Sequence, residues 1–122
     1  MNRDSYLPDL ISRKETRFVL VHFTGDESPT YEQIKNSHLK RGESEIGFHF
    51  IITDAGNTLM GRHISKVGCH HSELDKTSIG LCVIGNRDEM HDEQSIALTL
   101  LLEKLKSDYP SLETVKYLYK KN

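Results

Sequence analysis

The chain has few of the residues that mark several classes of protein. It contains only two cysteines, Cys69 and Cys82, in 122 residues. Two are too few for a disulfide framework, and their separation excludes a CxxC metal knuckle, so we expect both thiols to be reduced. The formal net charge is −2, and the basic run at Lys120 and Lys121 is short. The sequence therefore predicts no nucleic-acid partner, because such proteins need a basic face or stripe.

Long apolar segments are also missing. No run approaches the roughly 20 apolar residues that a membrane-spanning helix needs, and the N-terminal stretch MNRDSYLPDLISRKETR lacks the apolar core of a signal peptide. We therefore expect no membrane association and a cytoplasmic location. No repeat, linker or low-complexity tract interrupts the sequence. A chain of this length is expected to form one domain over residues 1–122.

Hydrophobic periodicity predicts an α/β fold. Runs of β-branched and aromatic residues indicate strands at 17–23, 47–53 and 78–85, a hairpin partner at 58–61, and an edge strand at 113–119. A capping-box pattern, Thr30 with Gln33, begins a helix that ends near Arg41, and an apolar stripe predicts a longer helix from Asp92 to before Pro110. The segment before Arg17 is expected to be a short helix or loop. The prediction is a central mixed β-sheet of about five strands flanked by helices.

His22 is the first candidate functional residue. It ends the apolar run FVLVH, and a polar side chain at the end of a buried strand is held rigidly by the sheet. Such a histidine suits a metal ligand or a general base. A zinc site needs three or four converging donors, however, so the partners of His22 decide the chemistry.

Several segments in order carry a resemblance to a known family: VLVHFTG, HLKRG, IGFHFIITDAGNTLMGR, KVGCHH and TSIGLCVIGN. Over roughly 18–109 the chain resembles the zinc N-acetylmuramoyl-L-alanine amidases of the phage T7 lysozyme and peptidoglycan-recognition-protein superfamily. The resemblance implies a groove above the sheet for peptidoglycan stem peptide and glycan. It also implies a zinc ion that polarises the scissile carbonyl and activates water, cleaving the bond between the muramic acid lactyl group and L-alanine.

The family's catalytic residues match this chain unevenly. His22 falls on the first zinc ligand. Phe48 replaces the catalytic tyrosine, which keeps the ring but removes the hydroxyl that would bond to water or an oxyanion. No carboxylate on strand 78–85 substitutes for it. The chain reaches Tyr117-Leu118-Tyr119 where the second ligand is expected and stops three residues later, so the second ligand, the third ligand and the family's lysine are predicted to be missing.

The predicted groove residues are His22, His49, Arg62, His70 and Ser78. For His49 a structural role is favoured over a groove-lining one, because it alternates with aromatic residues along a strand. His71 and His91 are expected to be solvated. A substitute metal site built from His22, Cys69, His70 and His71 is less favoured, because adjacent loop residues reach one metal only with special backbone geometry.

Two classes of function remain open. The first is a catalytically impaired amidase-like protein that acts by binding a muropeptide or a protein partner. T7 lysozyme also binds its phage RNA polymerase, which suggests such a partner by analogy only. The second is an active zinc amidase whose missing ligands come from a second chain, from the substitute histidines or from sequence elsewhere. We expect no cofactor in the first case and zinc in the second.

Overall fold

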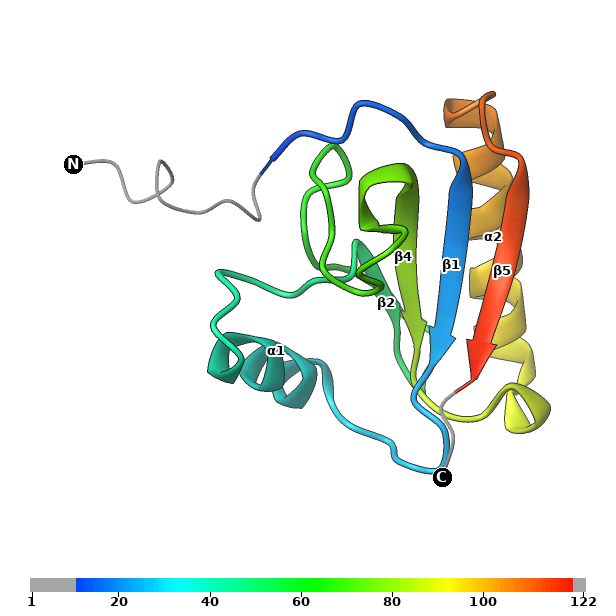
Figure 1. Cartoon of the computed structure of the whole chain (residues 1–122). Coiled ribbons are helices and arrows are strands. Elements are labelled where there is room, and N and C mark those ends of the chain that lie inside the picture. Colours follow the sequence, from blue (N-terminus) through cyan, green and yellow to red (C-terminus); the bar gives the residue numbers. More distant parts are fainter. Residues whose placement is uncertain (1–10, 120–122) are drawn as a thin grey trace.

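The computed structural model describes residues 11–119 and shows one five-stranded sheet with two helices. The strands are β1 (Phe18–Phe23), β2 (Phe50–Ile52), β3 (Thr58–Met60), β4 (Ser78–Val83) and β5 (Thr114–Tyr119), in the spatial order β3-β2-β4-β1-β5 (Figure 1). The helices are α1 (Tyr31–Lys40) and α2 (Asp92–Asp108), with short 3₁₀ turns η3 (Asp75–Thr77) and η4 (Arg87–Glu89). Only β3 runs antiparallel to its neighbour. The predicted mixed α/β sheet is confirmed.

The two helices lie on opposite faces of the sheet (Figure 1). Helix α2 packs Leu98, Leu101 and Leu105 against one face, where they join buried residues of β1 and β4 in the main core. A smaller core under α1 includes Ile34 and Cys82. Because successive strand residues point to opposite faces, β1 directs Val19, Val21 and Phe23 towards α2 and places His22 on the α1 face.

The continuous apolar sequence of strand β4 fits its central place in the sheet. All six of its residues are buried, as expected for a central strand of a sheet covered on both faces. Its residue Gly80 has no room for a side chain, since a Cβ there would lie 2.4–2.6 Å from ring atoms of His70. This close approach brings the loop 67–71 down onto the sheet.

The helix predictions are confirmed. Thr30 and Gln33 form the reciprocal capping box, and Gly42, with φ +94°, follows the end of α1 in a conformation that glycine adopts without strain. Helix α2 ends one residue before Tyr109, which precedes Pro110. No helix among residues 11–119 is long and apolar enough to cross a bilayer.

One strand is shorter than the sequence indicated. The run 47–53 was expected to be extended throughout, but β2 covers only Phe50–Ile52. The backbone before it turns under the loop 67–71, and a Cβ on Gly47 would lie 2.0 Å from the Cys69 carbonyl oxygen. The segment before β1 is not helical over 11–17 and makes one isolated bridge, Ser12 to Lys66. Residues 1–10 lie outside the described part of the chain.

Candidate functional site

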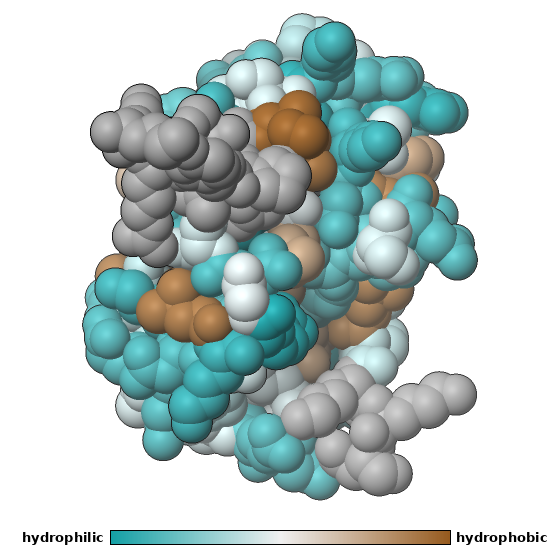
Figure 2. Space-filling model, turned by 60° about the vertical axis from the view of Figure 1, so that its left-hand side comes forward, coloured by the Kyte–Doolittle hydropathy of each residue, from teal (hydrophilic) through white to brown (hydrophobic). Residues whose placement is uncertain are grey.

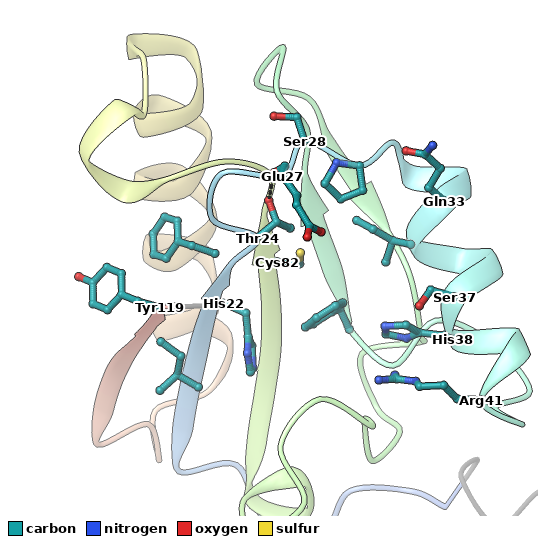
Figure 3. Close-up of a pocket in the computed structure, with 15 residues that line it drawn as sticks. His22, Thr24, Glu27, Ser28, Gln33, Ser37, His38, Arg41, Cys82 and Tyr119 are labelled. Carbon is teal, nitrogen blue, oxygen red and sulfur yellow. Dashed lines mark hydrogen bonds between the residues drawn. The ribbon is translucent and has the colours of Figure 1, made fainter. Parts of the chain in front are cut away.

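A groove of about 940 Å³ lies between α1 and the sheet (Figure 3). One wall is formed by α1 and the loop that precedes it, including Ser28, Ser37 and Arg41. His22, Phe48 and Cys82 line it from the sheet side. On the molecular face shown in Figure 2, hydrophobic side chains form separate small patches in a mainly hydrophilic surface.

His22 lies between two strands, and neither places a second good metal ligand beside it. In the sheet register its neighbours are Cys82 on β4 and Leu118 on β5. Leu118 carries no donor atom, and burial raises the pKa of the Cys82 thiol to about 12, which disfavours the thiolate that binds metals. Phe48 packs against the His22 ring at a centroid distance of 5.2 Å. Burial, with a smaller effect of His71, lowers the pKa of His22 to about 4.

His22 is joined to His70 through their ring nitrogens. His22 Nε2 lies 3.1 Å from His70 Nδ1. His70 Nε2 lies 3.5 Å from both Ser78 Oγ and Asp75 Oδ1. The Ser78 hydroxyl donates its own proton to the Leu74 carbonyl at 2.6 Å, so the proton on this side belongs to His70 Nε2. His70 Nδ1 is therefore an acceptor, and His22 donates to it from Nε2.

This arrangement forms a chain of contacts from His22 through His70 to the Asp75 carboxylate. Burial, followed by the repulsion of His22, lowers the pKa of His70 to about 2. Both imidazoles are therefore uncharged near neutral pH. The His70 side chain is fully buried, and its ring rests on Gly80. His71 Nδ1 is also buried and has no hydrogen-bond partner among residues 11–119, so the expectation that His71 is solvated is wrong for this atom.

Three residues predicted to line the groove lie beneath it. The His49 ring is fully buried, accepts the Gly80 N–H at Nδ1 (3.0 Å) and lies with Nε2 2.7 Å from the Lys66 carbonyl, to which it donates. Arg62 is also fully buried and donates to the carbonyls of three residues, Glu45, Ile46 and Val67. Ser78 has no exposed surface either. In this conformation a groove ligand touches none of the three, because their polar atoms hold loops to the sheet.

The wall contributed by α1 was not anticipated from the sequence. Ile34, Ser37, His38 and Arg41 recur at the three- and four-residue spacing of one helix face and all line the groove. His38 Nδ1 accepts the Gly47 N–H at 2.8 Å, which leaves the ring proton on Nε2. Burial is the main cause that lowers the pKa of His38 to about 4. The same spacing in the sequence was the available signal, because it places these side chains beside buried Ile34.

The zinc ion implied by the family resemblance can be tested against these donors. Among residues 11–119, no group of three or more His, Cys, Asp or Glu side chains is arranged to hold a metal ion. His22 donates to His70 from Nε2, which leaves Nδ1 as its one free donor atom for a metal, and Cys69 has a pKa raised to about 11, by burial and then by its contact with Glu43. The donors among residues 11–119 do not fit zinc.

Comparison with known proteins identifies the family. The model of the N-acetylmuramoyl-L-alanine amidase family matches residues 12–117. The endolysin of Enterobacteria phage K11 is 30% identical over 108 residues, covering 80% of this chain and 72% of that protein. The endolysin of Escherichia phage T7 is 30% identical over 80 residues, covering 63% of this chain and 53% of that protein.

Solved structures agree with this assignment. The amidase LysC from Clostridium intestinale URNW has a TM-score of 0.76 at 28% identity, covering 84% of this chain and 70% of that one. Bumblebee PGRP-SA has a TM-score of 0.69 at 26% identity, covering 93% and 79%. The family resemblance carried by the five sequence segments is thus confirmed by matches over most of the chain. The chain belongs to the N-acetylmuramoyl-L-alanine amidase family.

Proposed function

We propose that this chain binds a peptidoglycan fragment in the groove and does not hydrolyse it. The observation that supports this most directly is the environment of His22. Leu118 beside it on β5 and Phe48 against its ring can neither bind a metal nor transfer a proton, and burial keeps the thiol of Cys82 on β4 protonated. Hydrolysis of an amide needs a polarised carbonyl and a group that handles the water proton. The groove is retained, whereas these groups are lacking among residues 11–119.

The groove has the chemistry for a small polar peptide on a sugar. The side chains of Ser28, Ser37 and Arg41 make no hydrogen bond to other residues of the described range 11–119, so a ligand can use them. A guanidinium binds a carboxylate well, and hydroxyls suit amide groups. Ile34 and Phe48 add apolar surface for methyl groups and the sugar ring. A muramyl peptide presents a lactyl methyl group, amides and a carboxylate.

Relatives support the same ligand class. The ectodomain complex of peptidoglycan recognition proteins LCa and LCx, solved with tracheal cytotoxin bound, shares the fold at a TM-score of 0.73 and 24% identity. Peptidoglycan-recognition protein SC1a of Drosophila melanogaster is 34% identical over 56 residues. The second class, an active zinc amidase, would need ligands from beyond the described residues. No contact of residues 11–119 favours a protein partner over a muropeptide.

Calorimetric titration of N-acetylmuramyl-L-alanyl-D-glutamate tests the binding. We expect saturable binding, and Arg41→Met should weaken it about tenfold or more, because a charged hydrogen bond contributes about 1.5–3 kcal/mol. Lys104→Met is the matched control, since Lys104 lies on α2 and pairs with Asp108. Absence of binding at millimolar concentration would refute the proposal.

A separate assay tests the absence of hydrolysis. The same muropeptide is incubated with the protein, with and without added zinc. Release of the dipeptide that begins with L-alanine is followed by mass spectrometry. We expect no release in either case. Release that requires zinc and is abolished by His22→Ala would show that the chain is an active amidase.

A further inference from the structure

A small cavity of about 120 Å³ lies where the parallel strands β1, β2 and β4 end. Its lining comes from the loop after β1, from Asp54 after β2, and from the segment 84–89 after β4, with Gln94 of α2. The chain leaves β1 towards α1 on one face of the sheet and leaves the neighbouring β4 towards α2 on the other (Figure 1). Such a divergence at the carboxyl ends of parallel strands leaves a crevice in which ligands commonly bind.

Hydrogen bonds between the loops fix the shape of this cavity. The Gly25 N–H donates to the Gly85 carbonyl at 3.1 Å, and the Gly85 N–H donates to Thr24 Oγ1 at 2.7 Å. Asn86 Nδ2 donates to Asp26 Oδ1 at 2.6 Å. The loops after β1 and β4 are therefore held together before any ligand arrives, which lowers the ordering cost of binding.

The cavity has a negative lining. Asp26, Asp54 and Glu89 all contribute to it, and no lysine or arginine among residues 11–119 does. The carboxylates of Asp54 and Glu89 form no ion pair with another residue of that range. The N-terminus of α2 brings a partial positive charge nearby, but Asp92 and Glu93 in its first turn offset it. The net field favours a cation.

Gln94 provides an independent sign of a missing ligand. Its side chain is only 3% exposed, and its Nε2 donates one proton to the Thr53 carbonyl at 3.0 Å and the other to the Ile84 carbonyl at 2.8 Å. These two acceptors fix the orientation of the amide. Its Oε1 accepts no hydrogen bond from residues 11–119 and is left to the cavity that Gln94 lines. Unpaired oxygens of this kind are rare in buried side chains.

The ligand set indicates which cation fits. Among residues 11–119 no three carboxylates converge as a preformed metal site, so neutral oxygens and water must complete the coordination. Calcium accepts six to eight oxygen ligands of mixed type in a flexible geometry, whereas magnesium demands a regular octahedron. We propose that this cavity binds a calcium ion through the carboxylates of Asp54 and Glu89 and through Gln94 Oε1. This inference is independent of the proposed function.

Calorimetric titration of the whole chain with calcium chloride tests the site. We expect a dissociation constant of about 0.1–1 mM, because two charged ligands make a weak calcium site. About 10 mM calcium should then raise the melting temperature by about 5–10 °C, and sodium chloride at the same ionic strength should not. Asp54→Asn and Glu89→Gln should each weaken binding about tenfold or more, since each removes one charge from the ion. Asp88→Asn is the matched control, because Asp88 is an exposed carboxylate of η4 that does not line the cavity.

Nuclear magnetic resonance locates the ion. The backbone amides of Gly25 and Gly85 and the side-chain amide of Gln94 should shift together as calcium is added, while the amide of Ser37 in the groove should not.

Several outcomes would overturn the proposal. Absence of both heat and thermal stabilisation at about 10 mM calcium would do so, as would an equal stabilisation by sodium chloride, which would show charge screening alone. Unchanged affinity in both carboxylate variants, with their folding checked by circular dichroism, would place the ion elsewhere. Equal affinity for magnesium would reject calcium as the preferred ion. Asp54 and Glu89 are both exposed, so their variants are expected to fold.

Discussion

The buried histidines make the stability of this domain sensitive to mild acid. His22 and His49 have a pKa lowered to about 4, and His70 one lowered to about 2, in each case mainly by burial. The pKa of His38 is also lowered to about 4, mainly by burial. In the unfolded chain all of them return to a pKa near 6.5. The unfolded state therefore binds protons at a pH where the folded state does not.

The sign and size of the effect follow from this difference. Above about pH 7 the histidine rings are neutral in both the folded and the unfolded protein, so they do not make stability depend on pH. As the pH falls below about 6.5, the unfolded state is stabilised, and the free energy of unfolding decreases until the folded-state pKa is reached. For a pKa of 4, each histidine removes about 1 kcal/mol between pH 7 and 5.5. His22, His49 and His70 together then remove about 3 kcal/mol, a large part of a typical stability of about 5–15 kcal/mol.

Urea unfolding followed by far-ultraviolet circular dichroism measures this, since the chain has no tryptophan for fluorescence. Curves at pH values from about 7.5 to 5 should shift steadily to lower midpoints. His22→Asn should make this dependence shallower by the share of one group, whereas His63→Asn, at an exposed position, should leave it as in the wild type. A free energy of unfolding that is constant between pH 7 and 5.5 would refute the assignment of these rings as buried and neutral.

Three further measurements test the fold and the site. Gly80→Ala should lower the free energy of unfolding by about 1–3 kcal/mol, because its Cβ would lie 2.4–2.6 Å from the fully buried His70 ring; an unchanged urea midpoint contradicts this packing. His49→Leu should cost about 3 kcal/mol in the same assay, since it leaves the Gly80 N–H and the Lys66 carbonyl unpaired, and a loss below about 1 kcal/mol would show that water replaces the ring. The dialysed protein should hold no stoichiometric zinc by elemental mass spectrometry, because one imidazole is not a zinc site. Zinc retained at one ion per chain would contradict the donor analysis around His22.

Local patterns in the sequence were enough to predict most of the strands and helices. Alternation along 17–23 and the continuous apolar run of 78–85 indicated β1 and β4, and the Thr30–Gln33 capping box indicated where α1 begins. These features act between residues close in sequence, so they can be recognised before the fold is known. They also placed His22 near the end of a buried strand.

The functional site depended on contacts that no local pattern encodes. The rings of His22 and His70 meet across 48 positions of sequence, and their shared proton makes His22 a hydrogen-bond donor to its neighbour. Arg62 was expected in the groove, yet the loops around it supply enough carbonyl oxygens to hold it inside.

The sequence by itself determined most of the secondary structure and indicated the family. Each of these depends on residue identity or on short-range periodicity. The tertiary structure alone decided that α1 forms a wall of the groove, that His49 and Arg62 lie beneath it, and that Asp54 and Gln94 line one cavity. Packing decides such matters, because whether a polar atom faces solvent, a ligand or a backbone partner depends on which distant segments close over it.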